Sequence, residues 1–149
     1  KEEAAELVGI SFSSGEGPVA GWEREVFKKL DELMPGIVAV TDGPNGVIVS
    51  DGENLYKAGI FKEKSLVDRT GAGDSFGSGF VTALISRERR TSNPIFDSEA
   101  IKYAIRFASA NATSVVERVG ATEGILTREE FEKDPRWQNF SIEVKILKS

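Results

Sequence analysis

Residues 67–80 hold the groups of this chain best suited to chemistry. The segment reads Val-Asp-Arg-Thr-Gly-Ala-Gly-Asp-Ser-Phe-Gly-Ser-Gly-Phe, with a glycine-rich turn at Gly71–Gly73 and a carboxylate at Asp74. Glycine lets a backbone turn tightly and approach a ligand closely. A helix that starts after the turn presents free N–H groups and the positive end of its dipole to an anion. An anion site beside a base is an arrangement that transfers a phosphoryl group to a hydroxyl.

A purely structural interpretation of the same turn stays open on these residues alone. Short glycine-rich turns precede many helices, so a Gly-Ala-Gly-Asp tetrapeptide is a weak signal by itself. Asp74 would then be a first-turn acid that the helix dipole stabilises, with no catalytic role.

The composition narrows the chemistry further. The chain has 149 residues, a net charge of −5, 40% hydrophobic residues, no Cys and no His. Disulfides, zinc–thiolate sites, His-ligated metals and Ser-His-Asp catalysis are therefore excluded, and a general base has to be a carboxylate, Lys or Tyr. The acidic balance argues against a nucleic-acid partner. There is no long apolar run and no signal-peptide pattern, so we expect a cytoplasmic protein without a membrane span.

Predicted helices and strands alternate along the chain. Apolar spacing and helix formers predict helices over residues 1–8, 22–34, 73–86 and 98–117, and a capping box at Thr127–Glu130 opens a further short helix. Short apolar runs predict strands over residues 37–41, 47–50, 55–58 and 141–147, the last an edge strand. We therefore expect one α/β domain with a mostly parallel sheet flanked by helices.

The helix predicted over residues 73–86 carries the base. Its apolar stripe of Phe76, Phe80 and Leu84 is expected to face the core. Gly77 and Gly79 are unfavourable in a helix interior, and close packing of the backbone against the sheet or a ligand would compensate for them.

The string Asp-x-Thr-Gly-Ala-Gly-Asp-x-Phe at residues 68–76, followed by Gly79-Phe80, resembles the C-terminal fingerprint of the PfkB (ribokinase-like) carbohydrate kinase family. The resemblance covers residues 1–133. It implies that residues 1–149 are the C-terminal, nucleotide-binding part of a ribokinase-like domain whose N-terminal half is absent. It also implies a kinase that uses ATP and Mg²⁺ to phosphorylate a hydroxyl of a sugar or nucleoside.

The resemblance assigns roles to individual residues. Asp74 falls on the family's catalytic base, and the N–H groups of Gly71, Ala72, Gly73 and Asp74 match its anion hole. The Thr-x-Gly-x-x-Gly turn that contacts nucleotide phosphates is matched by Thr41, Gly43 and Gly46.

The helix that borders the adenine pocket in the family resembles residues 107–112. Ser109 aligns with a position that is often Asn or His in relatives, while Asn111 is offset by two positions. We therefore expect Ser109 to lie beside the nucleotide and Asn111 to serve in helix packing.

The resemblance also implies cation sites. Asp68, Thr70 and the loop at Gly120 match a site for an activating monovalent cation such as K⁺, although Gly124 stands where some relatives place a hydroxyl ligand. Glu3 matches the glutamate of an Asn-x-x-Glu motif that organises Mg²⁺. On the residues alone, Asp68 is equally a turn-forming carboxylate and Glu3 equally a solvated helix residue.

Two further functional hypotheses remain open. The chain could be a non-catalytic fragment that binds a nucleotide, or that pairs with the missing half or a second copy through an exposed sheet edge. It could also be a vitamin-precursor kinase of the same superfamily, although those typically carry Gly-Thr-Gly-Asp at the turn. Neither a Rossmann nor a P-loop fingerprint is present.

Overall fold

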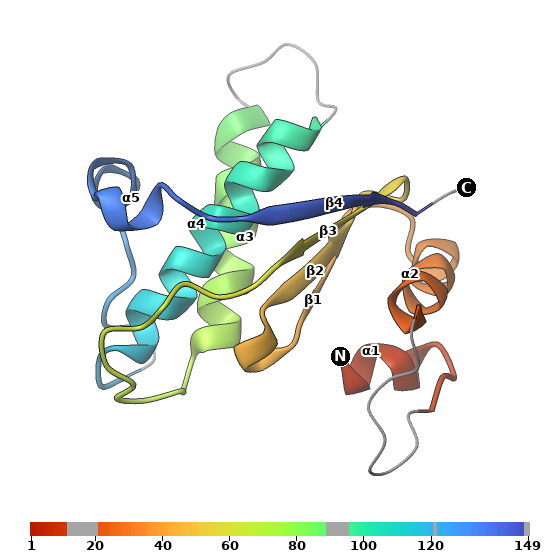
Figure 1. Cartoon of the computed structure of the whole chain (residues 1–149), viewed down its shortest axis with the longest axis horizontal. Coiled ribbons are helices and arrows are strands. Elements are labelled where there is room, and N and C mark those ends of the chain that lie inside the picture. Colours follow the sequence, from red (N-terminus) through yellow and green to blue (C-terminus); the bar gives the residue numbers. More distant parts are fainter. Residues whose placement is uncertain (12–20, 89–95, 121, 148–149) are drawn as a thin grey trace. The chain divides into compact units, whose positions relative to one another are not determined.

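The computed structural model describes residues 1–11, 21–88, 96–120 and 122–147 (Figure 1). The chain divides into two compact units. The first comprises Lys1–Lys57 and Glu143–Ser149, and the second comprises Ala58–Ile142. The predicted helix and strand types are confirmed, with boundaries that differ by at most a few residues.

The first unit is built on a four-stranded sheet. Its elements are α1 (Glu2–Leu7), α2 (Trp22–Leu33), β1 (Val38–Thr41), the 3₁₀ turn η1 (Gly43–Asn45), β2 (Val47–Ser50), β3 (Asn54–Ala58) and β4 (Ile142–Ile146). The strand order is β1-β2-β3-β4, which confirms the last strand as an edge strand and places β1 at the opposite edge.

The expectation of a mostly parallel sheet is wrong for these strands. β1 pairs with β2 in antiparallel register, with Val38 opposite Ser50 and Thr41 opposite Val47. The physical reason is the length of the connections, because residues 42–46 join β1 to β2 and residues 51–53 join β2 to β3. Parallel neighbours need a crossover of roughly a dozen residues or more, which neither turn provides.

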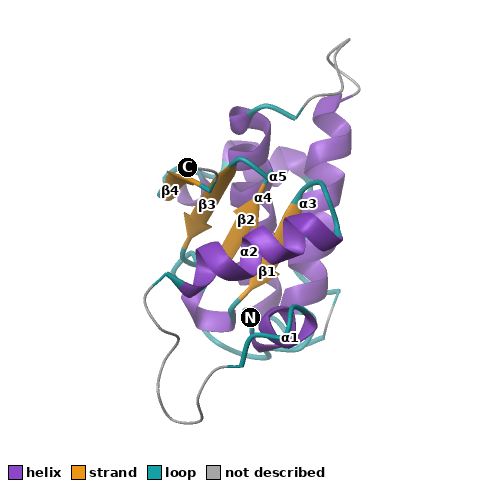
Figure 2. Ribbon diagram, turned by 90° about the vertical axis from the view of Figure 1, so that its right-hand side faces the viewer, coloured by secondary structure: helices purple, strands orange, loops and turns teal. Residues whose placement is uncertain are grey.

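One apolar face of α2 forms the core of this unit. Val26, Phe27 and Leu30 are buried there because their spacing brings them to one side of the helix. They belong to one cluster with Val40, Ile48, Leu55, Ala5 and Leu147. Figure 2 shows α2 lying across the sheet.

The second unit is a helix pair with a small C-terminal cap. Its elements are α3 (Ala72–Glu88), α4 (Ser98–Val116), α5 (Arg128–Lys133) and the 3₁₀ turn η2 (Pro135–Trp137). α3 and α4 lie side by side (Figure 1). The capping box predicted at the start of α5 is confirmed, since Thr127 and Glu130 satisfy each other's backbone N–H groups.

Glycine brings α3 and α4 close together. The predicted stripe is confirmed, because Phe76, Phe80 and Leu84 are all buried. A Cβ at Gly79 would lie 3.4 Å from the Cα of Ala108 on α4, whereas a Cβ at Gly77 would meet nothing within 4 Å. The close approach is thus to a helix rather than to the sheet, and it involves only Gly79.

In the described part of the chain, no helix is both long and apolar enough to cross a membrane.

The two glycines give a matched test of this packing. Gly79→Val is expected to lower the free energy of unfolding by roughly 1–3 kcal/mol, because the added atoms would force α3 away from α4. Gly77→Val enters open space and replaces a poor helix former, so it should leave stability unchanged or slightly raised. Urea unfolding of both variants measures the difference. Equal losses would contradict the close contact at Gly79.

Candidate active site

The turn before α3 exposes several unpaired backbone amides. Gly71 has a φ of 81°, a left-handed conformation that glycine adopts without strain. The N–H of Ser75 donates to the carbonyl of Gly71 at 2.8 Å, the first helical hydrogen bond. Among the described groups, none accepts from the N–H of Gly71, Gly73 or Asp74. Such a helix start can bind an anion.

Asp74 lies on the first turn of α3, and its side chain is exposed. No described side chain forms a hydrogen bond or an ion pair with its carboxylate. An exposed carboxylate without a side-chain partner can accept a proton from a ligand that binds beside the free amides. Its position is also that of a first-turn acid, which the helix dipole stabilises.

Three residues of the predicted monovalent-cation site come together. The Asp68 carboxylate accepts the Thr70 N–H at 2.9 Å. Hydrogen bonds from the Thr70 N–H and hydroxyl, and from the backbone of Gly120, hold the pKa of Asp68 below its ordinary value. Asp68 is therefore ionised at neutral pH. Within the described residues, no group of three or more carboxylates could hold a metal ion, so any cation here would rely mainly on neutral oxygens.

The end of α4 fixes the segment that leads into this turn. The carbonyl of Val116 accepts the N–H of Val67 at 2.9 Å and the N–H of Asp68 at 3.2 Å. We call residues 61–70 the connecting segment. Sequence reasoning missed this anchor, because a backbone carbonyl carries no side-chain signal.

Residues earlier in α4 hold the loop that contains Gly120. The Asn111 side chain is 2% exposed, donates to the Phe107 carbonyl at 3.1 Å and accepts the Leu126 N–H at 2.8 Å. Its predicted packing role is therefore confirmed. A Cβ at Gly124 would lie 2.6 Å from the Ser114 carbonyl oxygen, which explains why a glycine stands there.

Ser109 is 6% exposed on α4, and its carbonyl accepts the Thr113 hydroxyl. No contact of Ser109 with the Gly71–Asp74 turn is described, so its place beside a nucleotide stays a prediction.

The remaining predicted residues belong to the first unit. Thr41 ends β1, and Gly43 and Gly46 follow with φ values of 50° and 97°. The start of α1 lies beside this turn, since the Lys1 ammonium pairs with Asp42 at 3.0 Å and the Lys1 backbone nitrogen donates to the Thr41 carbonyl at 3.1 Å.

Glu3 is exposed on the first turn of α1. The structure therefore brings the helix of Glu3 next to the Thr41–Gly46 turn within one unit. The Gly71–Asp74 turn belongs to the other unit.

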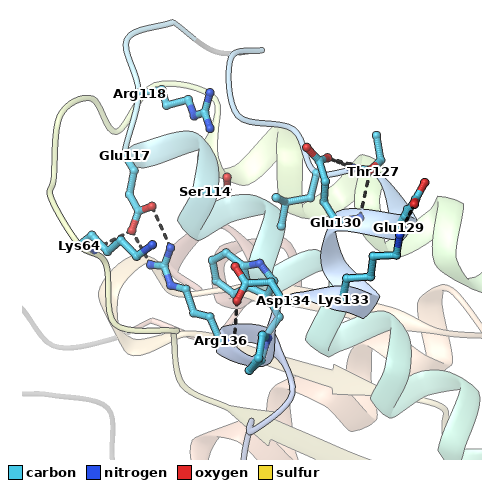
Figure 3. Close-up of a pocket in the computed structure, with 13 residues that line it drawn as sticks. Lys64, Ser114, Glu117, Arg118, Thr127, Glu129, Glu130, Lys133, Asp134 and Arg136 are labelled. Carbon is cyan, nitrogen blue, oxygen red and sulfur yellow. Dashed lines mark hydrogen bonds and ion pairs between the residues drawn. The ribbon is translucent and has the colours of Figure 1, made fainter.

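A separate hollow of about 770 Å³ lies between the end of α4, α5 and η2 (Figure 3). Its lining includes Lys64, Glu117, Arg118, Glu130 and Arg136, and none of the predicted site residues. Two charged pairs line its wall, Glu117–Arg136 between distant residues and Glu129–Lys133 at an i,i+4 spacing on α5.

Comparison with known proteins gives the context of this geometry. The pfkB family of carbohydrate kinases matches residues 1–128. A ribokinase of Haemophilus influenzae is 38% identical over 129 residues, which cover 86% of this chain and 36% of that protein.

Solved structures show the same fold. A ribokinase structure from Giardia lamblia has a TM-score of 0.72 and 27% identity, and the match covers 86% of this chain and 39% of that one. A fructokinase from Vibrio cholerae, solved with fructose, ADP and potassium ion, has a TM-score of 0.65 and 20% identity over 86% of this chain and 36% of that one. The chain thus spans little more than a third of the length of these proteins.

The two turn glycines respond differently to alanine. Gly71→Ala is expected to lower the free energy of unfolding by about 1–2 kcal/mol, because an L-residue is strained at this φ. Gly73→Ala has no such strain and nothing within 4 Å of the added methyl, so its stability should rise or stay unchanged. Urea unfolding distinguishes them, and a Gly71→Ala variant as stable as wild type would contradict the left-handed turn.

Proposed function

The chain belongs to the pfkB family of carbohydrate kinases, and we propose that it takes part in ATP-dependent phosphoryl transfer to a hydroxyl of a sugar or nucleoside. One observation carries the proposal. In a chain with this family match, the Gly71–Asp74 turn offers unpaired N–H groups on the same helix start as an unpaired carboxylate. Most of the catalysis of phosphoryl transfer comes from positioning and charge stabilisation, which such a turn can supply.

In this mechanism Asp74 is the general base. Its carboxylate accepts the proton of the attacking hydroxyl, which leaves the oxygen free to bond to phosphorus. The N–H groups of Gly71, Gly73 and Asp74, with that of Ala72, stabilise negative charge on the transferred group. ATP supplies the γ-phosphoryl group.

In the first unit, we assign nucleotide phosphate contacts to Thr41, Gly43 and Gly46. The positive φ of both glycines supports this role, because it gives a tight turn whose backbone a ligand can approach closely. We assign Glu3 to Mg²⁺, an ion that is commonly held by one or two carboxylates together with substrate phosphates. Ser109 is assigned to the border of the adenine site.

We further propose that Asp68, Thr70 and Gly120 surround an activating K⁺ ion. Their mutual contacts support this role, as does the potassium ion bound to the similar Vibrio cholerae fructokinase. Gly124 lacks a side chain, so backbone carbonyls of the same loop would complete the coordination.

A second candidate is a non-catalytic nucleotide-binding or partner-pairing fragment. The observation in its favour is that β1 forms one edge of the described sheet, where a strand of another chain could add. The experiment on Asp74 separates the two candidates.

Removal of the base gives the direct test. In the protein made from the full reading frame that encodes this chain, Asp74→Asn is expected to lower kcat by roughly 10²–10⁴-fold, because the amide cannot accept the proton. The assay follows Mg-ATP with a panel of sugars, sugar phosphates and nucleosides, and products are identified by mass.

The matched control is Glu99→Gln, an exposed acid on the first turn of α4. It should keep the wild-type rate. A near-wild-type kcat in Asp74→Asn would refute the base. A wild type that binds ATP but phosphorylates no acceptor would favour the non-catalytic fragment.

The cation site predicts a salt effect on the same enzyme. Replacing Na⁺ by K⁺ at constant ionic strength should raise kcat, and Asp68→Asn should abolish this response because the ligand loses its charge. Steady-state rates in the two salts measure the ratio. A wild-type rate that is the same in both salts would refute the K⁺ site, but it would not bear on the role of Asp74.

A further inference from the structure

Glu117 and Arg136 form a partly buried ion pair at the end of α4. Their side chains are 13% and 18% exposed, respectively. One guanidinium nitrogen of Arg136 donates to Glu117 Oε2 at 3.0 Å, and the other contacts Oε1. This two-point geometry makes a strong, directional pair. The guanidinium also stacks over the Trp137 ring, 4.1 Å from its centroid.

Both members of the pair also hold the backbone of the connecting segment. The N–H of Lys64 donates to Glu117 Oε1 at 2.6 Å, and Arg136 Nη2 donates to the Lys62 carbonyl at 2.9 Å. Figure 3 shows Glu117 between Lys64 and Arg136. The carboxylate thus meets a donor and the guanidinium meets an acceptor on two nearby residues of the same segment.

Apart from this pair, the described contacts of the connecting segment are concentrated at its two ends. Leu66 and Val67 are 48% and 50% exposed, so burial of their apolar side chains contributes little. At its beginning, Phe61 contacts the ring of Trp137 at 5.0 Å between centroids. At its end, Val116 accepts from Val67 and Asp68. The Glu117–Arg136 pair is the polar attachment between these two points.

We propose that Glu117 and Arg136 are positioning residues that fix the connecting segment and, through it, Asp68 and the Gly71–Asp74 turn. This inference rests on the proposed kinase function. Neither residue is one to which we assign a contact with substrate or nucleotide. The pair acts by limiting the positions open to the backbone that enters the catalytic turn.

Glu117 and Arg136 are both charged at neutral pH. The hydrogen bonds from Arg136 and from the Lys64 N–H hold the pKa of Glu117 below its usual range, so the carboxylate is ionised at neutral pH. Removing one partner would leave the other charge partly buried and unpaired, which costs more than the pair itself contributes.

The test compares Glu117→Ala with Glu129→Ala in the protein made from the full reading frame. Glu129 lines the same hollow and pairs with Lys133, but it does not contact the connecting segment. Hydrogen exchange of residues 62–74 and steady-state kinetics are measured on both. We expect at least about tenfold faster exchange and an approximately tenfold lower kcat/KM in Glu117→Ala, with neither change in the control.

A charge swap separates positioning from general stability. The double variant Glu117→Arg/Arg136→Glu can re-form the ion pair, but it places a donor opposite the Lys64 N–H and an acceptor opposite the Lys62 carbonyl. We expect its thermal midpoint to recover while exchange and kcat/KM stay altered. Arg136→Lys, which loses the two-point geometry but keeps the charge, provides a milder variant should the alanine variant fail to fold.

The outcomes are distinct. Wild-type exchange and kcat/KM in Glu117→Ala, or in Arg136→Lys, would overturn the positioning role, as would a swap that restores both. A wild-type enzyme without kinase activity would instead refute the proposed function, and the exchange measurement would still decide whether the pair holds the connecting segment.

Discussion

The backbone carbonyl of Val116 is the group on which the candidate site depends most. It ends α4, where helix carbonyls lack intrahelical donors, and it accepts N–H groups from Val67 and Asp68. The carbonyl at the helix end and the N–H groups of the connecting segment therefore satisfy each other's need for a hydrogen-bond partner. From that point the chain has only a few residues before α3 begins at Ala72. The close contact of α3 with α4 at Gly79 then fixes the helix that carries Asp74.

Local signals in the sequence predicted several elements around the candidate site, although not the Val116 anchor. Glycine with positive φ at Gly71, the capping box of Thr127 and Glu130, and the apolar stripe of α3 all depend on residues close together in the chain. Such features can be read from spacing because neighbouring residues determine them. The motif around Asp74 was recognisable for the same reason, and the family match agrees with it.

Features that depend on distant residues could not be predicted in this way. Glu117 and Arg136 look like ordinary surface charges in the sequence, and only the fold brings them to the backbone of Lys64. The antiparallel pairing of β1 and β2 was missed for another reason. The alternation of helices and strands favours parallel pairing, whereas the short turn between β1 and β2 permits only antiparallel pairing.

In the proposed mechanism the amides of the Gly71–Asp74 turn bind the phosphoryl group that is transferred. The most direct measurement is an NMR titration of the isotope-labelled protein from the full reading frame with Mg-ADP and a phosphoryl-transfer mimic such as aluminium fluoride. We expect the amide resonances of Gly71, Gly73 and Asp74 to shift when the mimic is added to the Mg-ADP complex. Saturation of nucleotide binding with these resonances unmoved would contradict it.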